Sequence, residues 1–281
     1  MSEPFVRLEL EDRAYLERLE EMPMSFRTFG RPDEIDVAWH RDENQGRIGS
    51  CQSNALTSIL ERLQYVQSND KSKVVQLSRI FGYLATQKID RLLGQDSGST
   101  ISGGAKLALT VGVCPESLTG YPAGYPDGAS IRKILSQDNY NAAAPYRALK
   151  SWRASSDVEE CMSFIAGGGG INIGVAWYSG LIPRDRVVRS FNPPARGGGH
   201  AMSILGYTKS GNLIGMNSWG DGKYEITPTA WKQMINHRFT AAVGLTGTTA
   251  PRIVSWKDEL SFVPDNIFVD PLNPNPAGEL A

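Results

Sequence analysis

The stretch NQGRIGSCQSNALTSILE, residues 44–61, places a cysteine at the beginning of a segment with helical periodicity. Its apolar residues recur at the spacing of one helix face: Cys51, Ala55, Leu56, Ile59, Leu60 and Leu63. Ser50 stands where it could cap this helix. A helix N-terminus lowers the pKa of a thiol in its first turn. A single cysteine is more often a small core residue, so a nucleophilic role for Cys51 needs an activating partner elsewhere.

A histidine in the second half of the chain is the best candidate for that partner. His200 lies in GGGHAMSILGY, where glycines lead into a predicted strand, and the next predicted strand carries Asn217 in MNSWG. Asn217 could accept the ring N–H of His200 and fix its tautomer. His40 and His237 have no comparable neighbours, so we expect both to be structural or on the surface.

Composition limits the classes of function. The 281 residues include 29 Lys+Arg and 30 Asp+Glu, a net charge of −1, so nothing in the charge favours nucleic acid or an anionic membrane as a partner. No apolar run is long enough to span a membrane, and the charged N-terminal residues do not resemble a secretory signal. The three cysteines, Cys51, Cys114 and Cys161, include no CxxC pair. We therefore expect free thiols, a reducing compartment, and no metal or organic cofactor.

The order of elements predicts an α+β protein. Helical patterns cover the first half (near 5–21, 51–63, 76–93, 101–111 and around 130–137), and short apolar runs with turn signals dominate the second half, beginning at Ile171. Two helical patterns, at 157–166 and 227–237, lie among these strands. We expect two lobes packed face to face. The Pro-rich tail DPLNPNPAGELA, residues 270–281, is predicted to be extended.

Several motifs together resemble those of the papain-like cysteine peptidase family. NQGRIGSCQSNA is similar to its active-site signature, and GGGHAMSILGY and IGMNSWG are similar to its His and Asn motifs, in the same chain order. LSRIFGYL, DSGSTISGGAKLAL and GVCPES resemble the prokaryotic and viral branch. The resemblance covers about residues 45–244. It implies a helical lobe that carries the Cys and a strand-rich barrel lobe that carries the His and Asn.

The resemblance also implies roles for individual residues. Cys51 would be the nucleophile, His200 its partner in a thiolate–imidazolium pair, and Asn217 the residue that orients His200. Gln45 would donate to the oxyanion together with the backbone amide of Cys51. Trp219 would shield the His–Asn hydrogen bond. The residues implied in the substrate cleft are Gly49, Ser50, Ser97, Gly98, Ser99, Thr100, Gly199 and Trp219.

The chain departs from the family pattern in several places. Ile48 stands where secreted members have a disulfide-forming cysteine, and Gln52 replaces the usual Trp after the nucleophile. Ser99 and Thr100 replace a glycine pair of the cleft wall, and the segment after Asn217 lacks a second Trp. These changes affect subsites and leave every catalytic group present. The segment before Gln45 is shorter than the family's inhibitory prodomain, so we expect an enzyme that is made active or restrained by something else.

These observations set the domain organisation and the alternatives. We expect an N-terminal extension and connector at 1–43, a catalytic domain at 44–250 divided near residue 135, and a C-terminal extension at 251–281.

The leading hypothesis is a cysteine endopeptidase acting on peptides or proteins, cytoplasmic or virion-associated. One alternative is a papain-fold structural subunit of a larger assembly, such as a phage virion. Another is a transpeptidase or amidase with the same catalytic residues.

Overall fold

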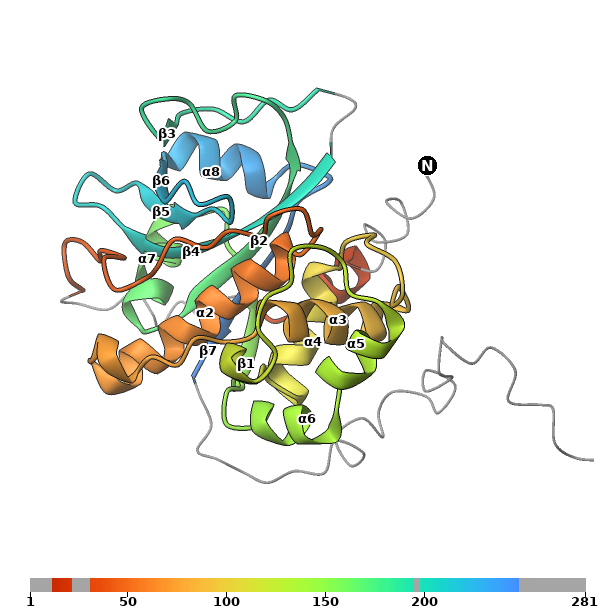
Figure 1. Cartoon of the computed structure of the whole chain (residues 1–281). Helices are drawn as coiled ribbons and strands as arrows, with labels where there is room; N and C mark the ends of the chain where they lie inside the picture. Colours follow the sequence, from red (N-terminus) through yellow and green to blue (C-terminus); the bar gives the residue numbers. More distant parts are fainter. Residues whose placement is uncertain (1–11, 22–30, 195–197, 248–281) are drawn as a thin grey trace, which may run out of the picture.

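A long helix begins at Cys51 and lies against one face of a single β-sheet (Figure 1). The computed structural model describes residues 12–21, 31–194 and 198–247. Its helices are α2 Cys51–Ser68, α3 Arg79–Asp90, α4 Ile101–Thr110, α5 Gly128–Ile134, α6 Gln137–Ala143, α7 Val158–Ala166 and α8 Pro228–Ile235, with short 3-10 turns at Lys71–Lys73 and Glu116–Leu118. The expected α+β class is confirmed.

The sheet contains seven strands in the order β1-β7-β2-β4-β5-β6-β3. Their bounds are β1 Lys150–Arg153, β2 Gly170–Trp177, β3 Val187–Val188, β4 Gly198–Tyr207, β5 Leu213–Met216, β6 Lys223–Ile226 and β7 Ala241–Thr246. All neighbours pair antiparallel except β3 and β6. The strand-rich lobe is thus one continuous sheet with β1 and β3 as its end strands.

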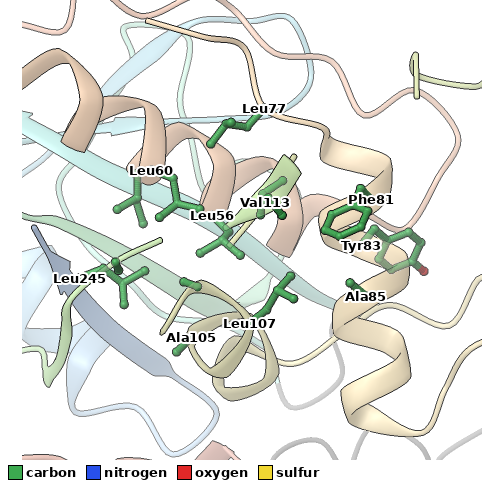
Figure 2. Packing of buried hydrophobic residues seen from close by; sticks show 14 of the residues in the cluster. Leu56, Leu60, Leu77, Phe81, Tyr83, Ala85, Ala105, Leu107, Val113 and Leu245 are labelled. Atoms are coloured by element: carbon green, nitrogen blue, oxygen red, sulfur yellow. The ribbon is translucent and has the colours of Figure 1, made fainter. Parts of the chain in front are cut away.

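One face of the sheet packs against the helices of the first half. Leu56, Ile59 and Leu60 of α2 belong to the same buried cluster as Leu205 of β4 and Leu245 of β7. Figure 2 shows Leu56 and Leu60 pointing from α2 into this cluster, toward side chains of the neighbouring elements. Because successive strand residues face opposite sides, the intervening residues of β4 and β7 belong to the second cluster, beneath α7 and α8. The sheet therefore separates two apolar cores.

Helix boundaries follow recognisable local chemistry. The side chain of Thr100 accepts from the backbone amide of Gly103 and so caps α4, and Thr227 caps α8 before a proline in its first turn. Gly112 ends the α4 region with φ +85°, as its sequence position predicts. A side chain at Gly112 would also overlap the backbone carbonyl of Ala143. The packing of α6 against α4 therefore needs glycine there.

The expected lobe boundary near residue 135 needs a correction. Helix α6 was not expected, and its Tyr140 packs edge-on against Phe81 of α3 with ring centroids 5.2 Å apart. Tyr140 and Ala143 belong to the cluster that α2, α3 and α4 share. The helical part thus continues through α6, because its apolar residues are buried against the preceding helices.

The segment before Gln45 packs on the domain where it is described. Ile35 exchanges backbone hydrogen bonds of 2.9 and 3.0 Å with Tyr207, and Val37 and Trp39 are buried. The predicted N-terminal helix is helical at 12–16, and the remainder of its expected range up to residue 11 lies outside the described residues, as does the expected C-terminal extension. Residues 31–43 thus form part of the domain.

Candidate active site

The thiol of Cys51 lies where the start of α2 meets β4. Hydrogen bonding from the backbone of Ala201, the residue after His200, lowers the pKa of this thiol, as does hydrogen bonding from the backbone of Gln52 and of Cys51 itself. Cys51 is partly exposed, whereas Cys114 and Cys161 are fully buried, and all three thiols are free. The fold thus brings the predicted nucleophile to the strand that carries the predicted base.

His200 and Asn217 are joined by a hydrogen bond. The distance from His200 Nε2 to Asn217 Oδ1 is 2.8 Å, and both side chains are buried. Asn217 Oδ1 also accepts the backbone amide of Ser218 at 2.9 Å. An oxygen that already accepts an N–H is matched by a ring N–H, so Nε2 carries the proton in the neutral imidazole and Nδ1 is left as its basic nitrogen.

Two tryptophans cover the imidazole. The Trp219 ring stacks on His200 with centroids 4.4 Å apart and 30° between planes, and Trp177 meets His200 edge-on at 4.9 Å. Trp219 is 41% exposed, so its outer face is in solvent while its inner face excludes water from the imidazole. Trp177 was not among the predicted site residues. The β2–β4 pairing, which no local pattern encodes, places it opposite Gly198.

Burial moves the two reactive groups toward their neutral forms. It raises the pKa of the Cys51 thiol, the backbone amides at the helix start oppose that increase, and the negative charge of Asp96 adds to it. Burial likewise lowers the pKa of His200, whereas the hydrogen bond to Asn217 and the charge of Asp221 raise it. The expected thiolate–imidazolium pair therefore has to overcome burial at both groups, and the attraction between the two charges is what would favour it.

Gln45 is held beside Asn217 by Ser218. Gln45 Oε1 accepts the Ser218 hydroxyl at 2.6 Å, and the Gln45 backbone amide donates to the Ser218 carbonyl at 2.7 Å. Gln45 Nε2 donates to the carbonyl of Ile48 at 3.0 Å, which leaves its second N–H for another acceptor. Ser218 was not predicted, although it stands within the MNSWG motif.

Several implied cleft residues are placed differently from expectation. Ser50 is fully buried, its side chain does not cap α2, and its hydroxyl lies 2.7 Å from that of Tyr121. Thr100 is also buried, with its hydroxyl committed to Asp90 and to the α4 cap. The side chains of Ser50 and Thr100 are therefore committed to contacts within the protein, and the expectation that these residues contact substrate stays a prediction.

The remaining implied cleft residues are partly or fully exposed. Gly49, Ser97, Gly98 and Ser99 are partly exposed, and Gly199 is exposed. The Gly49 amide donates to Asp96 at 2.9 Å, and the Gly98 amide donates to the Tyr83 hydroxyl at 3.0 Å. These two amides hold the 94–98 loop beside the residues preceding Cys51, so they are not available to substrate in this structure.

Among the described residues, no group of three or more His, Cys, Asp or Glu side chains could hold a metal ion. In the same part of the chain, every helix is too short or too polar to cross a membrane. His40 lies apart from the site against Trp39, with ring centroids 5.2 Å apart.

Solved structures similar to this chain are papain-like cysteine proteases, bacterial ones among them. Xylellain, a cysteine protease from Xylella fastidiosa, has a TM-score of 0.67 and 25% identity over 83% of this chain and 92% of its own. The cysteine protease and lectin-like domains of Cwp84, a surface layer associated protein of Clostridium difficile, have a TM-score of 0.61 and 18% identity over 89% of this chain and 61% of their own. The Carica candamarcensis cysteine protease CMS1MS2, in complex with E-64, has a TM-score of 0.53 and 17% identity over 79% of this chain and 100% of its own.

These structural similarities show that the fold is that of papain-like cysteine proteases. No protein-family model and no curated protein matches the sequence. The resemblance to the prokaryotic and viral branch stays a prediction.

Proposed function

We propose that this protein is a cysteine endopeptidase in which Cys51, His200 and Asn217 act as a catalytic triad. The observation that carries the proposal is the 2.8 Å bond from His200 Nε2 to Asn217 Oδ1, together with the amide of Ala201 at the Cys51 thiol. The first contact leaves His200 Nδ1 as the basic nitrogen, and the second brings the thiol to the residue next to His200. A nucleophile, a base and a group that orients the base are the parts that acyl transfer requires.

The proposed chemistry moves protons through His200 Nδ1 in both acylation and deacylation. The Cys51 sulfur attacks the scissile carbonyl carbon, and the thiol proton moves to Nδ1. Collapse of the tetrahedral intermediate breaks the C–N bond, and Nδ1 gives its proton to the leaving amine. Water then attacks the thioester with Nδ1 as base, which releases the acid and restores the thiol.

Gln45 is the proposed side-chain donor to the oxyanion. Its orientation is supported by Ser218, since an amide whose Oε1 accepts the Ser218 hydroxyl must present Nε2 on the other side. The backbone amide of Cys51, at the start of α2, would supply the second donor. Each such donor contributes about 3 kcal/mol of transition-state stabilisation in acyl-transfer enzymes.

The structural-subunit alternative is not favoured, because the similar structures are proteases and the four proposed catalytic residues are all present. Nothing supports an assignment to a virion. A peptide or protein substrate and a reducing, cytoplasmic location remain our proposals, the latter resting on the three free thiols. A transpeptidase or amidase would form the same thioester, and analysis of the products distinguishes these reactions.

The experiment that tests the proposal is covalent labelling with E-64 followed by a peptide-library digest. Wild type should gain one E-64 at Cys51, whereas Cys51→Ser and unfolded wild type should gain none. The digest should yield new carboxyl and amino termini with wild type alone. Absence of both labelling and cleavage in the folded wild type would refute the proposal, and labelling of Cys114 or Cys161 instead would refute the assignment of Cys51.

A further inference from the structure

The amide of Asn217 is held at both of its ends. Its Oδ1 accepts from His200 and from the Ser218 backbone, while its Nδ2 donates to Asp221 Oδ2 at 3.2 Å. Rotating this amide by half a turn would place its NH2 against two N–H donors and its oxygen against a carboxylate. Asp221 thus helps to select the one orientation in which Asn217 can accept from His200.

Asp221 is itself fixed by Arg186. Arg186 Nη1 lies 2.8 Å from Asp221 Oδ2, the oxygen that Asn217 also contacts. The other nitrogens of the guanidinium donate to the backbone carbonyls of Lys223 at 3.1 Å and Gly222 at 3.0 Å. Arg186 has φ +62°, a conformation that is costly for a residue with a side chain, and its carbonyl accepts from Glu225 at 2.8 Å. The three nitrogens of the Arg186 guanidinium group therefore bind residues 221, 222 and 223 of this turn.

We propose that Asp221, held by Arg186, is a positioning residue that keeps the oxygen of Asn217 turned toward His200. This inference rests on the proposed function. The Asp221 carboxylate also favours the charged imidazole, since its negative charge raises the pKa of His200 against the lowering effect of burial. Among the described residues, Asp221 is the charged group that shifts the pKa of His200. Trp177 and Trp219 cover its ring without charge.

Two substitutions separate the role of Asp221 as hydrogen-bond acceptor for Asn217 from the effect of its negative charge on His200. Asp221→Asn keeps an oxygen for Asn217 and removes the charge, so kcat should stay within about threefold while the pKa of His200 falls. Asp221→Ala removes both, so kcat should fall by about tenfold with little change in KM, because a hydrogen bond to a charged group is lost. Arg186→Gln releases Asp221 without touching Asn217 and should lower kcat less than Asp221→Ala does.

Asp185→Ala is the matched control. Asp185 forms an exposed ion pair of 2.7 Å with Arg189 in the same loop and has no contact with Asn217, so this substitution should leave every readout at the wild-type value. The readouts are kcat and KM on a cleaved peptide, the rate of Cys51 alkylation by iodoacetamide against pH, and the NMR signal of the His200 Nε2 proton. That proton signal should broaden or disappear in Asp221→Ala and remain in Asp221→Asn, which a purely structural role of Asp221 would not produce.

The outcomes distinguish the inference from the proposed function. If His200→Ala cleaves the peptide with the kcat of wild type, the proposed function itself is wrong. If cleavage depends on His200 but Asp221→Ala and Arg186→Gln both behave like Asp185→Ala, the inference is overturned and the function stands. If Asp221→Ala fails to fold, two other variants still test the inference. Asp221→Asn should retain the proton signal and lower the pKa of His200, and Arg186→Gln should reduce kcat.

Discussion

Gln45 and Ser218, 173 residues apart, are bound to each other through both side chain and backbone. The hydroxyl of Ser218 donates to Gln45 Oε1 at 2.6 Å, and the Ser218 carbonyl accepts the Gln45 amide at 2.7 Å. The neighbouring residues Asn44 and Trp219 form an isolated antiparallel bridge. The loop that carries the proposed oxyanion donor is therefore attached to the strand end that carries Asn217.

This attachment predicts how two substitutions should compare. Gln45→Ala removes a donor needed mainly in the transition state, so kcat should fall by roughly a hundredfold with KM nearly unchanged. Ser218→Ala removes only the hydroxyl that orients Gln45, so it should lower kcat in the same direction by a smaller factor. Steady-state kinetics on one peptide substrate measures both. Equal activity of Gln45→Ala and wild type would contradict the oxyanion assignment.

Cys51 should be the most reactive of the three thiols. Burial raises the pKa of Cys114 to about 12 and raises that of Cys161 further, and neither side chain is exposed. Cys51 is partly exposed and accepts backbone amides at the start of α2. Alkylation rates measured against pH by peptide mapping should therefore rise first at Cys51. Equal rates at all three cysteines in the folded protein would argue against an activated thiol.

His200→Ala and Asn217→Ala report whether the thiolate–imidazolium pair forms. If it forms, wild-type Cys51 should react at a pH well below that of the His200→Ala variant, because a neighbouring imidazolium stabilises the thiolate. Asn217→Ala should also shift the alkylation profile, and Gln45→Ala should leave it nearly unchanged. A wild-type profile identical to that of His200→Ala would mean that burial prevails and the resting pair is neutral.

Gly104→Ala should be destabilising. A Cβ at position 104 of α4 would overlap the side-chain amide of Gln52, which is buried directly after Cys51. Gln52 Oε1 accepts the hydroxyl of Ser99 at 3.1 Å, so moving Gln52 should disturb the 97–99 wall as well. Overpacking of this kind costs about 1–3 kcal/mol, which urea unfolding would measure. Gly124→Ala, where a Cβ meets nothing within 4 Å, is the control and should unfold like wild type.

His40 should make the protein less stable in mild acid. Burial, and secondarily the charge of Arg41, lowers the pKa of His40 from 6.5 to about 4. Between these values the unfolded chain takes up a proton that the folded protein does not, so the free energy of unfolding falls as pH falls. Partial exposure of His40 as a whole reduces the effect to about 1–2 kcal/mol between pH 7 and pH 5. His40→Gln should lose that much less than wild type over this range in urea unfolding, and an identical loss would contradict the assignment.

The sequence by itself determined the elements that depend on local patterns. The spacing of Leu56, Ile59 and Leu60 indicated α2, and the glycines before His200 marked the start of β4. The position of His200 and Asn217 on successive predicted strands was enough to expect their hydrogen bond, which is present. These signals are readable because helix and strand periodicities are properties of neighbouring residues.

Tertiary structure alone decided the contacts between distant segments. Ser50 and Thr100 look like cleft residues in a motif, yet their hydroxyls are buried against Tyr121 and Asp90. The short elements α6, β1 and β3 were not expected from the sequence, and each is held by neighbours that pair with it or cover it. Arg186 reaches Asp221 from 35 residues away. Hydrogen bonds of this kind depend on where the sheet brings two chain segments together, and no local pattern encodes that position.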